Sequence, residues 1–322
     1  MKTLNAYKKL LIVLSMLFSF ISSYAQTDQD AIMMNKNLFC TGINYSYSSW
    51  NKYWEGTNLR DNLNIGTIST NAVSVMGNYG LKNNLNLLFN APFVANKASM
   101  GVLHPASGIQ DFSAWVKWMP IEKSLKNGTF SLYLLGGASV PMTDYIVDYL
   151  PLSIGLKSST VSGRLILDYQ IGSFFVTGSE TYTIRGNTKL ERNSYYTTSL
   201  FLTNEVSMPD VNTVSLRTGY RSSGLIAEAI ISDMKTLGGF DITKNNMPFP
   251  SNRMNATTIA ANIKYEIQKI DGLALVGGAS HVIAGRNVGQ STGFYGGFFY
   301  ILDFSKKKDK KSTSNNSSTQ NK

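Results

Sequence analysis

The stretch "TTIAANIKYEIQ", residues 257–268, alternates between apolar and polar side chains. Because successive side chains point to opposite sides of a β-strand, one face would be apolar around Ile263 and the other polar around Lys264. This period of two predicts a β-strand with one apolar and one polar face. The same alternation recurs at 85–93, 112–118 and 161–169.

Alternation alone does not separate a soluble β-sandwich from a membrane barrel, since either fold gives a strand two unlike faces. The N-terminus adds the information that the chain is exported. Lys2, Lys8 and Lys9 precede the apolar run 10–21, and small residues lead to a predicted cut after Ala25. The only cysteine, Cys40, lies away from that cut, so no lipoprotein and no intramolecular disulfide is expected.

The formal net charge of +10 comes mainly from the two ends of the chain. Residues 1–25 contribute +3 and residues 305–322 contribute +5, which leaves +2 for residues 26–304. A basic surface that could bind nucleic acid is therefore not expected, and nucleic acid is excluded as a partner.

Twelve stretches are predicted as strands: 39–50, 65–79, 84–94, 109–119, 129–141, 160–170, 172–184, 194–206, 211–232, 256–268, 273–283 and 291–304. The stretch 211–232 changes phase by one residue after "RSSG" (221–224), which we interpret as a bulge within one strand. A hairpin there would give thirteen strands, and a strand hidden in 233–250 would allow fourteen. An even number returns both chain ends to the same side of a membrane.

Connections between these stretches are predicted to be short at 80–84, 171–172, 208–211 and 269–272, and long at 51–64, 95–108, 142–159 and 233–255. Periplasmic turns and extracellular loops of outer-membrane barrels alternate in this way. Trp50, Tyr53 and Trp54 on one side, and Trp118 on the other, are predicted interface aromatics.

The last stretch, "GGFFYILDF" at 296–304, carries aromatic residues on alternate positions and resembles the C-terminal signal that barrel-assembly machinery recognises. We therefore predict an all-β fold: a closed antiparallel transmembrane β-barrel of about 12 strands, with 14 possible. We expect it to lie in the lipid of the outer membrane of a Gram-negative cell. The predicted segments are a signal peptide (1–25), an N-terminal periplasmic segment (26–38), the barrel (39–304) and a disordered, lysine-rich periplasmic tail (305–322). The sequence leaves open whether 26–38 or the loop 233–255 plugs the lumen.

Residues for catalysis are scarce. His104 and His281 are the only histidines, and neither has Cys, Asp or Glu at metal-ligand spacing. No nucleophile motif and no phosphate-binding loop is present. We expect no enzymatic activity, no metal and no cofactor.

Charged residues on the predicted inward face are the candidates for a functional site. These lumen-lining candidates are Asp111, Lys117, Arg164, Asp168, Arg217, Arg221, Lys264 and Glu266. They could form cross-strand ion pairs that brace the barrel, or a selectivity region along a restricted path for solutes.

Two segments carry a resemblance to a family. "NLNLLFNAPFVANK" (84–97) followed by "ASGIQDFSAWVKW" (106–118), and "AGRN" (284–287) before the closing strand, resemble the MetA-pathway phenol-degradation family of outer-membrane proteins. The matching motif positions are Gly108, Asp111, Gly285, Arg286 and Asn287; the second glycine of the family's Gly-Leu-Gly-Asp is Gln110 here. The "YAQ" junction at 24–26 is typical of Bacteroidota.

The resemblance implies a transporter-like, porin-like barrel that takes up small organic solutes, hydrophobic ones included, by passive diffusion. The alternative is a non-conducting structural or secretion-associated barrel that docks periplasmic partners, with the lysine-rich tail as the docking element. A soluble exported β-sandwich is a weaker third reading, because lysine and arginine on the inward face do not suit a single apolar core.

Overall fold

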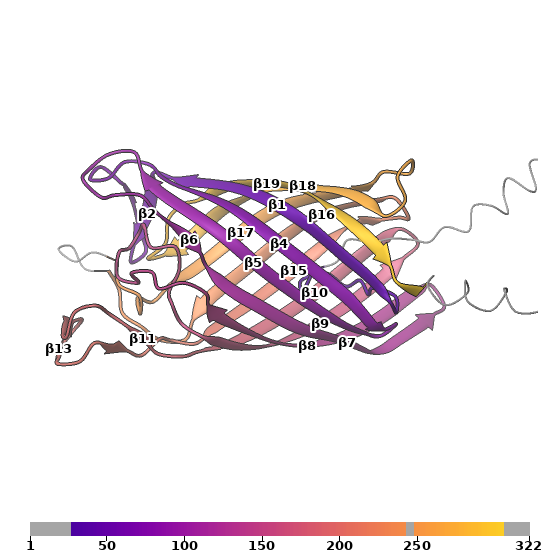
Figure 1. Cartoon of the computed structure of the whole chain (residues 1–322), viewed down its shortest axis with the longest axis horizontal. Coiled ribbons are helices and arrows are strands. Elements are labelled where there is room, and N and C mark those ends of the chain that lie inside the picture. Colours follow the sequence, from indigo (N-terminus) through magenta and orange to yellow (C-terminus); the bar gives the residue numbers. More distant parts are fainter. Residues whose placement is uncertain (1–26, 243–247, 306–322) are drawn as a thin grey trace, which may run out of the picture.

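The computed structural model describes residues 27–242 and 248–305, which form one closed antiparallel sheet with small loop sheets at one end (Figure 1). The predicted signal peptide and most of the predicted tail lie outside these residues. The wall strands are β1 (Leu38–Trp50), β4 (Ile68–Lys82), β5 (Leu85–Ala98), β7 (Asp111–Leu125), β8 (Gly128–Pro141), β9 (Thr160–Ile171), β10 (Phe174–Arg185), β15 (Val211–Arg221), β16 (Leu225–Thr236), β17 (Asn255–Glu266), β18 (Leu273–Arg286) and β19 (Thr292–Asp303).

The sheet closes through its first strand. β1 pairs with β4 on one side and with the last strand, β19, on the other, so Phe39 lies opposite both Tyr79 and Leu302. The short β6 (Ala106–Ile109) pairs with the C-terminal part of β5, and β7 pairs with the N-terminal part of β5. β6 and β7 therefore share one position in the wall. Twelve antiparallel wall positions result, which confirms the predicted fold class, and closure leaves no open edge.

Many apolar side chains of the wall face outward and are exposed. Ile43, Val75 and Phe298 lie beside one another across three paired strands, with 43–47% of each residue exposed. Aromatic side chains on the outward face gather near one end of the barrel: Trp118, Tyr169, Phe174, Tyr220, Tyr265 and Tyr300. A barrel with an apolar outer band and a polar inside is the inverse of a soluble protein.

Short turns join the strands at one end of the barrel, at 83–84, 126–127, 172–173, 222–224 and 267–272, and we call this the short-turn end. The connections at the other end, which we call the long-loop end, are 51–67, 99–105, 142–159, 186–210, 237–254 and 287–291 (Figure 1).

Two predictions about strands are wrong, and they cancel in the count. Residues 211–232 form a hairpin rather than one bulged strand: the turn at 222–224, closed by the Ser222 amide on the Leu225 carbonyl, resets the face and produces the change of phase. Residues 194–206 belong to a long loop, not to the wall, so 208–211 is not a short connection either. No strand lies in the described part of 237–250, which leaves twelve wall positions rather than fourteen.

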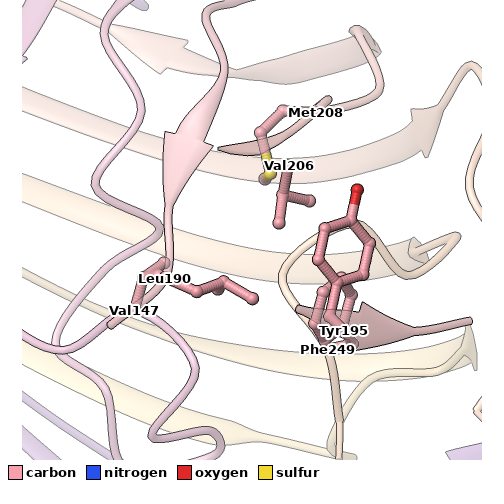
Figure 2. Close-up of a cluster of buried hydrophobic side chains, with 6 residues drawn as sticks. All are labelled: Val147, Leu190, Tyr195, Val206, Met208 and Phe249. Carbon is pink, nitrogen blue, oxygen red and sulfur yellow. The ribbon is translucent and has the colours of Figure 1, made fainter. Parts of the chain in front are cut away.

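The long loops carry small sheets of their own and an apolar cluster. These sheets pair β2 (Lys52–Glu55) with β3 (Asn58–Asp61), β11 (Thr188–Lys189) with β14 (Glu205–Val206), and β12 (Tyr195–Tyr196) with β13 (Leu200–Phe201). Figure 2 shows the cluster, in which the loops 142–159, 186–210 and 237–254 bring together Val147, Leu190, Tyr195, Val206, Met208 and Phe249. These loops therefore pack on one another beyond the wall.

The predicted interface aromatics divide between wall and loop. Trp118 faces outward and is 45% exposed. Trp54 instead lies in β2, 7% exposed, and it packs against Gly285 of β18. Alternation could not show this, because the β2–β3 hairpin folds back onto the end of β18. In the part of the chain that the structure describes, no helix is long and apolar enough to cross a membrane.

Candidate functional site

The lumen contains the chain's own N-terminal segment, residues 27–34. The segment is shaped by Asp30, whose carboxylate accepts hydrogen bonds from the Thr27 amide (2.6 Å) and the Ile32 amide (3.2 Å). The chain then continues to Asn37, whose amide bonds the Gly80 carbonyl before β1 begins. The sequence predicts an N-terminal periplasmic segment at 26–38 and leaves open whether it plugs the lumen. In the structure, residues 27–34 contact side chains that point into the barrel.

Lys117 of β7 is the best buried of these inward side chains, with 0% of it exposed. Its Nζ donates to the Thr27 carbonyl (3.0 Å), the Asp30 carbonyl (2.6 Å) and the Asp30 Oδ1 (2.9 Å). A buried ammonium needs such partners, because an unpaired charge away from water is costly. Lys117 therefore holds the turn of the segment from one side.

Three further wall residues bind the segment. Arg164 of β9 donates from Nη1 to the carbonyl (2.6 Å) and to Oδ2 (2.7 Å) of Asp28. Arg217 of β15 donates to Gln29 Oε1 at 2.8 Å. Tyr133 of β8 donates to the Ala31 carbonyl at 2.9 Å. The segment is thus bound from four strands, β7, β8, β9 and β15.

Apolar contacts complete this packing. Ala31 lies in a buried cluster with Tyr133, Leu135 and Ile166. Ile32 contacts Phe175 and Ile226 on the next part of the wall. Nearer β1, Met34 packs with Leu38, Cys40 and Phe299. Both polar and apolar side chains of the segment therefore match the wall they face.

The other lumen candidates are paired within the wall. Arg217 also forms an ion pair with Glu228 (2.9 Å), Arg221 pairs with Asp168 (3.1 Å), and Lys264 pairs with Glu266 (3.2 Å). Asp111 lies near the long-loop end, where it accepts a hydrogen bond from Tyr145 Oη at 2.8 Å. Burial and then the Asp111 contact raise the pKa of the Tyr145 hydroxyl, so that it remains a donor. Seven of the eight candidates are thus wall pairs or ligands of the segment, and Asp111 binds a loop residue.

Side chains do not fill the lumen completely. A cavity of about 300 Å³ lies beside residues 27–32, and Arg217, Lys264 and Phe299 of the β15–β19 wall line it. A second cavity, of about 180 Å³, also borders residues 27–29 and lies against Asn78 and Trp115. A third, of about 680 Å³, extends from residues 31–33 to the turns of the short-turn end. The segment thus occupies the space between cavities.

The family-motif residues lie at the long-loop end. Asn287, at a positive φ of 54°, accepts hydrogen bonds from the amides of Gly56 and Ile242, and donates to Asp241 and to the Arg253 carbonyl. Arg286 Nε donates to Asp241 Oδ1 at 2.7 Å. The Arg286 contact, more than the Asn287 contact, holds the pKa of Asp241 below its usual value. These two residues tie the loops 51–67 and 237–254 to the end of β18.

The motif glycines serve close packing. A Cβ on Gly285 would stand 2.5 Å from the Trp54 ring and from a Val288 methyl group, so only glycine admits the β2–β3 hairpin there. A Cβ on Gly108 would stand 3.0 Å from Ile154, which is a milder conflict than the one at Gly285.

Sequence reasoning missed two groups of residues in the lumen. In the N-terminal segment they are Asp28, Gln29 and Asp30, and in the wall they are Trp115, Tyr133, Phe175 and Glu228. The signal that could have found the segment is "TDQDAIMM" (27–34), a polar, acidic stretch followed by apolar residues directly before the first strand. Within residues 27–242 and 248–305, no three His, Cys, Asp or Glu side chains gather to hold a metal ion.

Comparison with one solved structure supports the fold. The COG4313 outer membrane channel from Pseudomonas putida F1 superimposes with a TM-score of 0.68 at 12% sequence identity, covering 86% of this chain and 100% of that one. The translocator domain of the autotransporter NalP from Neisseria meningitidis gives a TM-score of 0.45 at 11% identity over 85% of this chain and 90% of that one. No protein-family model and no curated protein matches the chain.

Proposed function

We propose that the chain is an outer-membrane β-barrel channel that lets small organic solutes, hydrophobic ones included, diffuse inward. The outward face supports the membrane location: exposed Ile43, Val75 and Phe298 would be unfavourable in water and suit lipid. Wall strands of 11–15 residues suffice to cross a bilayer when tilted. In this proposal the signal peptide is removed after Ala25, and the closing strand β19 engages the barrel-assembly machinery.

The observation that carries the channel proposal is that a segment of chain, not the wall itself, occupies the middle of the lumen. Cavities of about 300 and 180 Å³ flank residues 27–29, and one of about 680 Å³ reaches the short turns. Residues 27–34 are bound by side-chain hydrogen bonds and are continuous with the wall only through β1. If this segment leaves, the cavities join into a path. The COG4313 protein of the same fold is described as an outer membrane channel, which agrees with this proposal.

Liposome swelling tests the proposal. Mature protein and a variant lacking residues 27–33 are reconstituted, with heat-modifiable gel mobility to show that each has folded. We expect slow swelling in small neutral solutes such as arabinose for the mature protein and faster swelling for the deletion variant. A folded deletion variant that admits no solute would refute diffusion through the lumen.

The second candidate, a non-conducting barrel that docks periplasmic partners, draws on the same occupied lumen. Lys117, Arg164 and Arg217 hold the segment firmly enough for the barrel to remain closed. Deleting 305–322 tests the docking role: loss of a co-purifying complex with normal barrel assembly would favour it over transport.

A further inference from the structure

We propose that Lys117 and Arg164 form a carboxylate-binding site in the lumen wall. Asp30 and Asp28 of the chain's own segment occupy this site in the structure, and a small solute that carries a carboxylate on an apolar body takes their place when the segment leaves. This inference rests on the proposed channel function and adds the chemical class of solute that the lumen prefers.

The sheet register places the two cations at one level of the wall. Lys117 of β7 lies opposite Leu135 of β8, and Leu135 lies opposite Arg164 of β9. Adjacent strands are about 4.8 Å apart, so the two backbones are roughly 10 Å apart. Both side chains reach the turn at residues 27–30, which sets the ammonium and the guanidinium against one short stretch of chain.

Charge balance distinguishes this pair from the other lumen cations. Arg217, Arg221 and Lys264 each have an acidic partner on the wall itself. Among the described residues, the only carboxylates within ion-pair distance of Lys117 and Arg164 belong to Asp30 and Asp28. Departure of the segment therefore leaves two positive charges in the lumen without carboxylates, and these charges attract an anion.

The surroundings of the two cations favour an anion with an apolar body. The Arg164 guanidinium lies 4.7 Å from the centre of the Trp115 ring, and the Lys117 Nζ lies 5.5 Å from that of Tyr133. Leu135 and Ile166 are buried beside them. Apolar side chains of this kind take up the body of a ligand, while the charged groups fix its carboxylate.

The bound segment already has this pattern of groups. Asp28 and Asp30 present carboxylates to the cations, and Ala31 packs against Tyr133, Leu135 and Ile166. A solute with a carboxylate and an apolar ring or chain would satisfy the same groups. The segment thus competes with such a solute for one site.

Binding of benzoate, compared with its neutral analogue benzamide, tests the site by calorimetry on folded mature protein. The Asp28→Asn/Asp30→Asn variant keeps the shape of the segment but weakens its competition. We expect this variant to bind benzoate roughly ten-fold more tightly than it binds benzamide, because charge-assisted contacts are stronger than neutral ones. We also expect it to bind benzoate roughly ten-fold more tightly than the unchanged protein does. Asp271→Asn, an exposed carboxylate in the turn 267–272, is the matched control and should bind as the unchanged protein does.

Adding Lys117→Met and Arg164→Met to the variant should abolish its preference for benzoate. Equal binding of benzoate and benzamide, or no binding of either, would overturn the inference. If the double Asn variant does not fold, deletion of 27–33 exposes the same cations by another route. With that deletion, the peptide "TDQDAIMM" should compete with benzoate and "TNQNAIMM" should not.

Conductance separates this inference from the channel proposal. Anion-selective current through the deletion variant supports both, and cation-selective current refutes the site while the channel stands. A deletion variant that binds benzoate but carries no current refutes the channel and leaves the site in place.

Discussion

Substitution of Lys117 by methionine should release the N-terminal segment from the lumen. Methionine has nearly the length of lysine and no charge, so the wall stays filled while the three hydrogen bonds from Nζ to Thr27 and Asp30 are lost. The Asp30 carboxylate keeps its bonds to the Thr27 and Ile32 amides, so the turn itself can persist.

The magnitude follows from those three bonds. Hydrogen bonds to a charged group contribute about 1.5–3 kcal/mol each. Burying the ammonium, which is 0% exposed, offsets much of their sum. We take about 3 kcal/mol as the net loss, the lower end of the range for breaking a buried ion pair. This corresponds to a shift of roughly 150-fold between the bound and the released segment.

Hydrogen–deuterium exchange of the peptide that contains residues 27–37 measures the release. In Lys117→Met, the amides that the segment protects should exchange on the order of 100-fold faster, while the wall strands keep their protection. Lys126 is an exposed lysine in the turn that joins β7 to β8. Lys126→Met is the control and should leave exchange unchanged. Unchanged protection of the segment in Lys117→Met would refute the assignment of Lys117 as its anchor.

Three further predictions concern the long-loop end. Asp241 has a lowered pKa, so its contact with Arg286 stabilises the loop above the ordinary carboxyl value of 3.8 and is lost as the pH falls through the lowered pKa. Pepsin cleavage within 237–254 should therefore rise as the pH falls below 3.8, and Asp241→Asn should remove this dependence. Gly285→Val should displace the buried Trp54 ring, shift tryptophan emission to the red and lower the free energy of unfolding by about 1–3 kcal/mol. Unchanged emission would contradict the packing of Trp54 on Gly285. Phe249→Ala removes a ring stacked 5.2 Å from Tyr195, so loop 186–210 should become protease-sensitive, with heat-modifiable mobility of the barrel intact; a resistant loop would count against the cluster.

The closed twelve-stranded barrel could be predicted from the sequence because alternation records which way each side chain points. Residues 257–266 of the stretch 257–268 belong to β17, with Ile263 outward and Lys264 buried. The hairpin at 211–236 was misread because a tight turn and a bulge both shift the phase by one residue. Residues 194–206 are rich in Tyr, Thr, Leu and Phe, yet Tyr195 packs into the loop cluster and not into the wall.

The lumen could be predicted only in part. Alternation assigned Lys117 and Arg164 to the inward face, but it holds no information about what lies opposite across the barrel. Their carboxylate partners are 87 and 136 residues away in the sequence, in a segment without strand character. The roles of Arg286 and Asn287 were equally hidden, since they bind loops that are distant in sequence.

Single-channel conductance in planar bilayers tests the central claim most directly, with folded mature protein compared to the variant that lacks residues 27–33. If the segment closes a solute path, the mature protein should show little or no current, and the deletion variant should show discrete, stable steps. A folded deletion variant without current would contradict the account, because the lumen would then be closed by the wall itself.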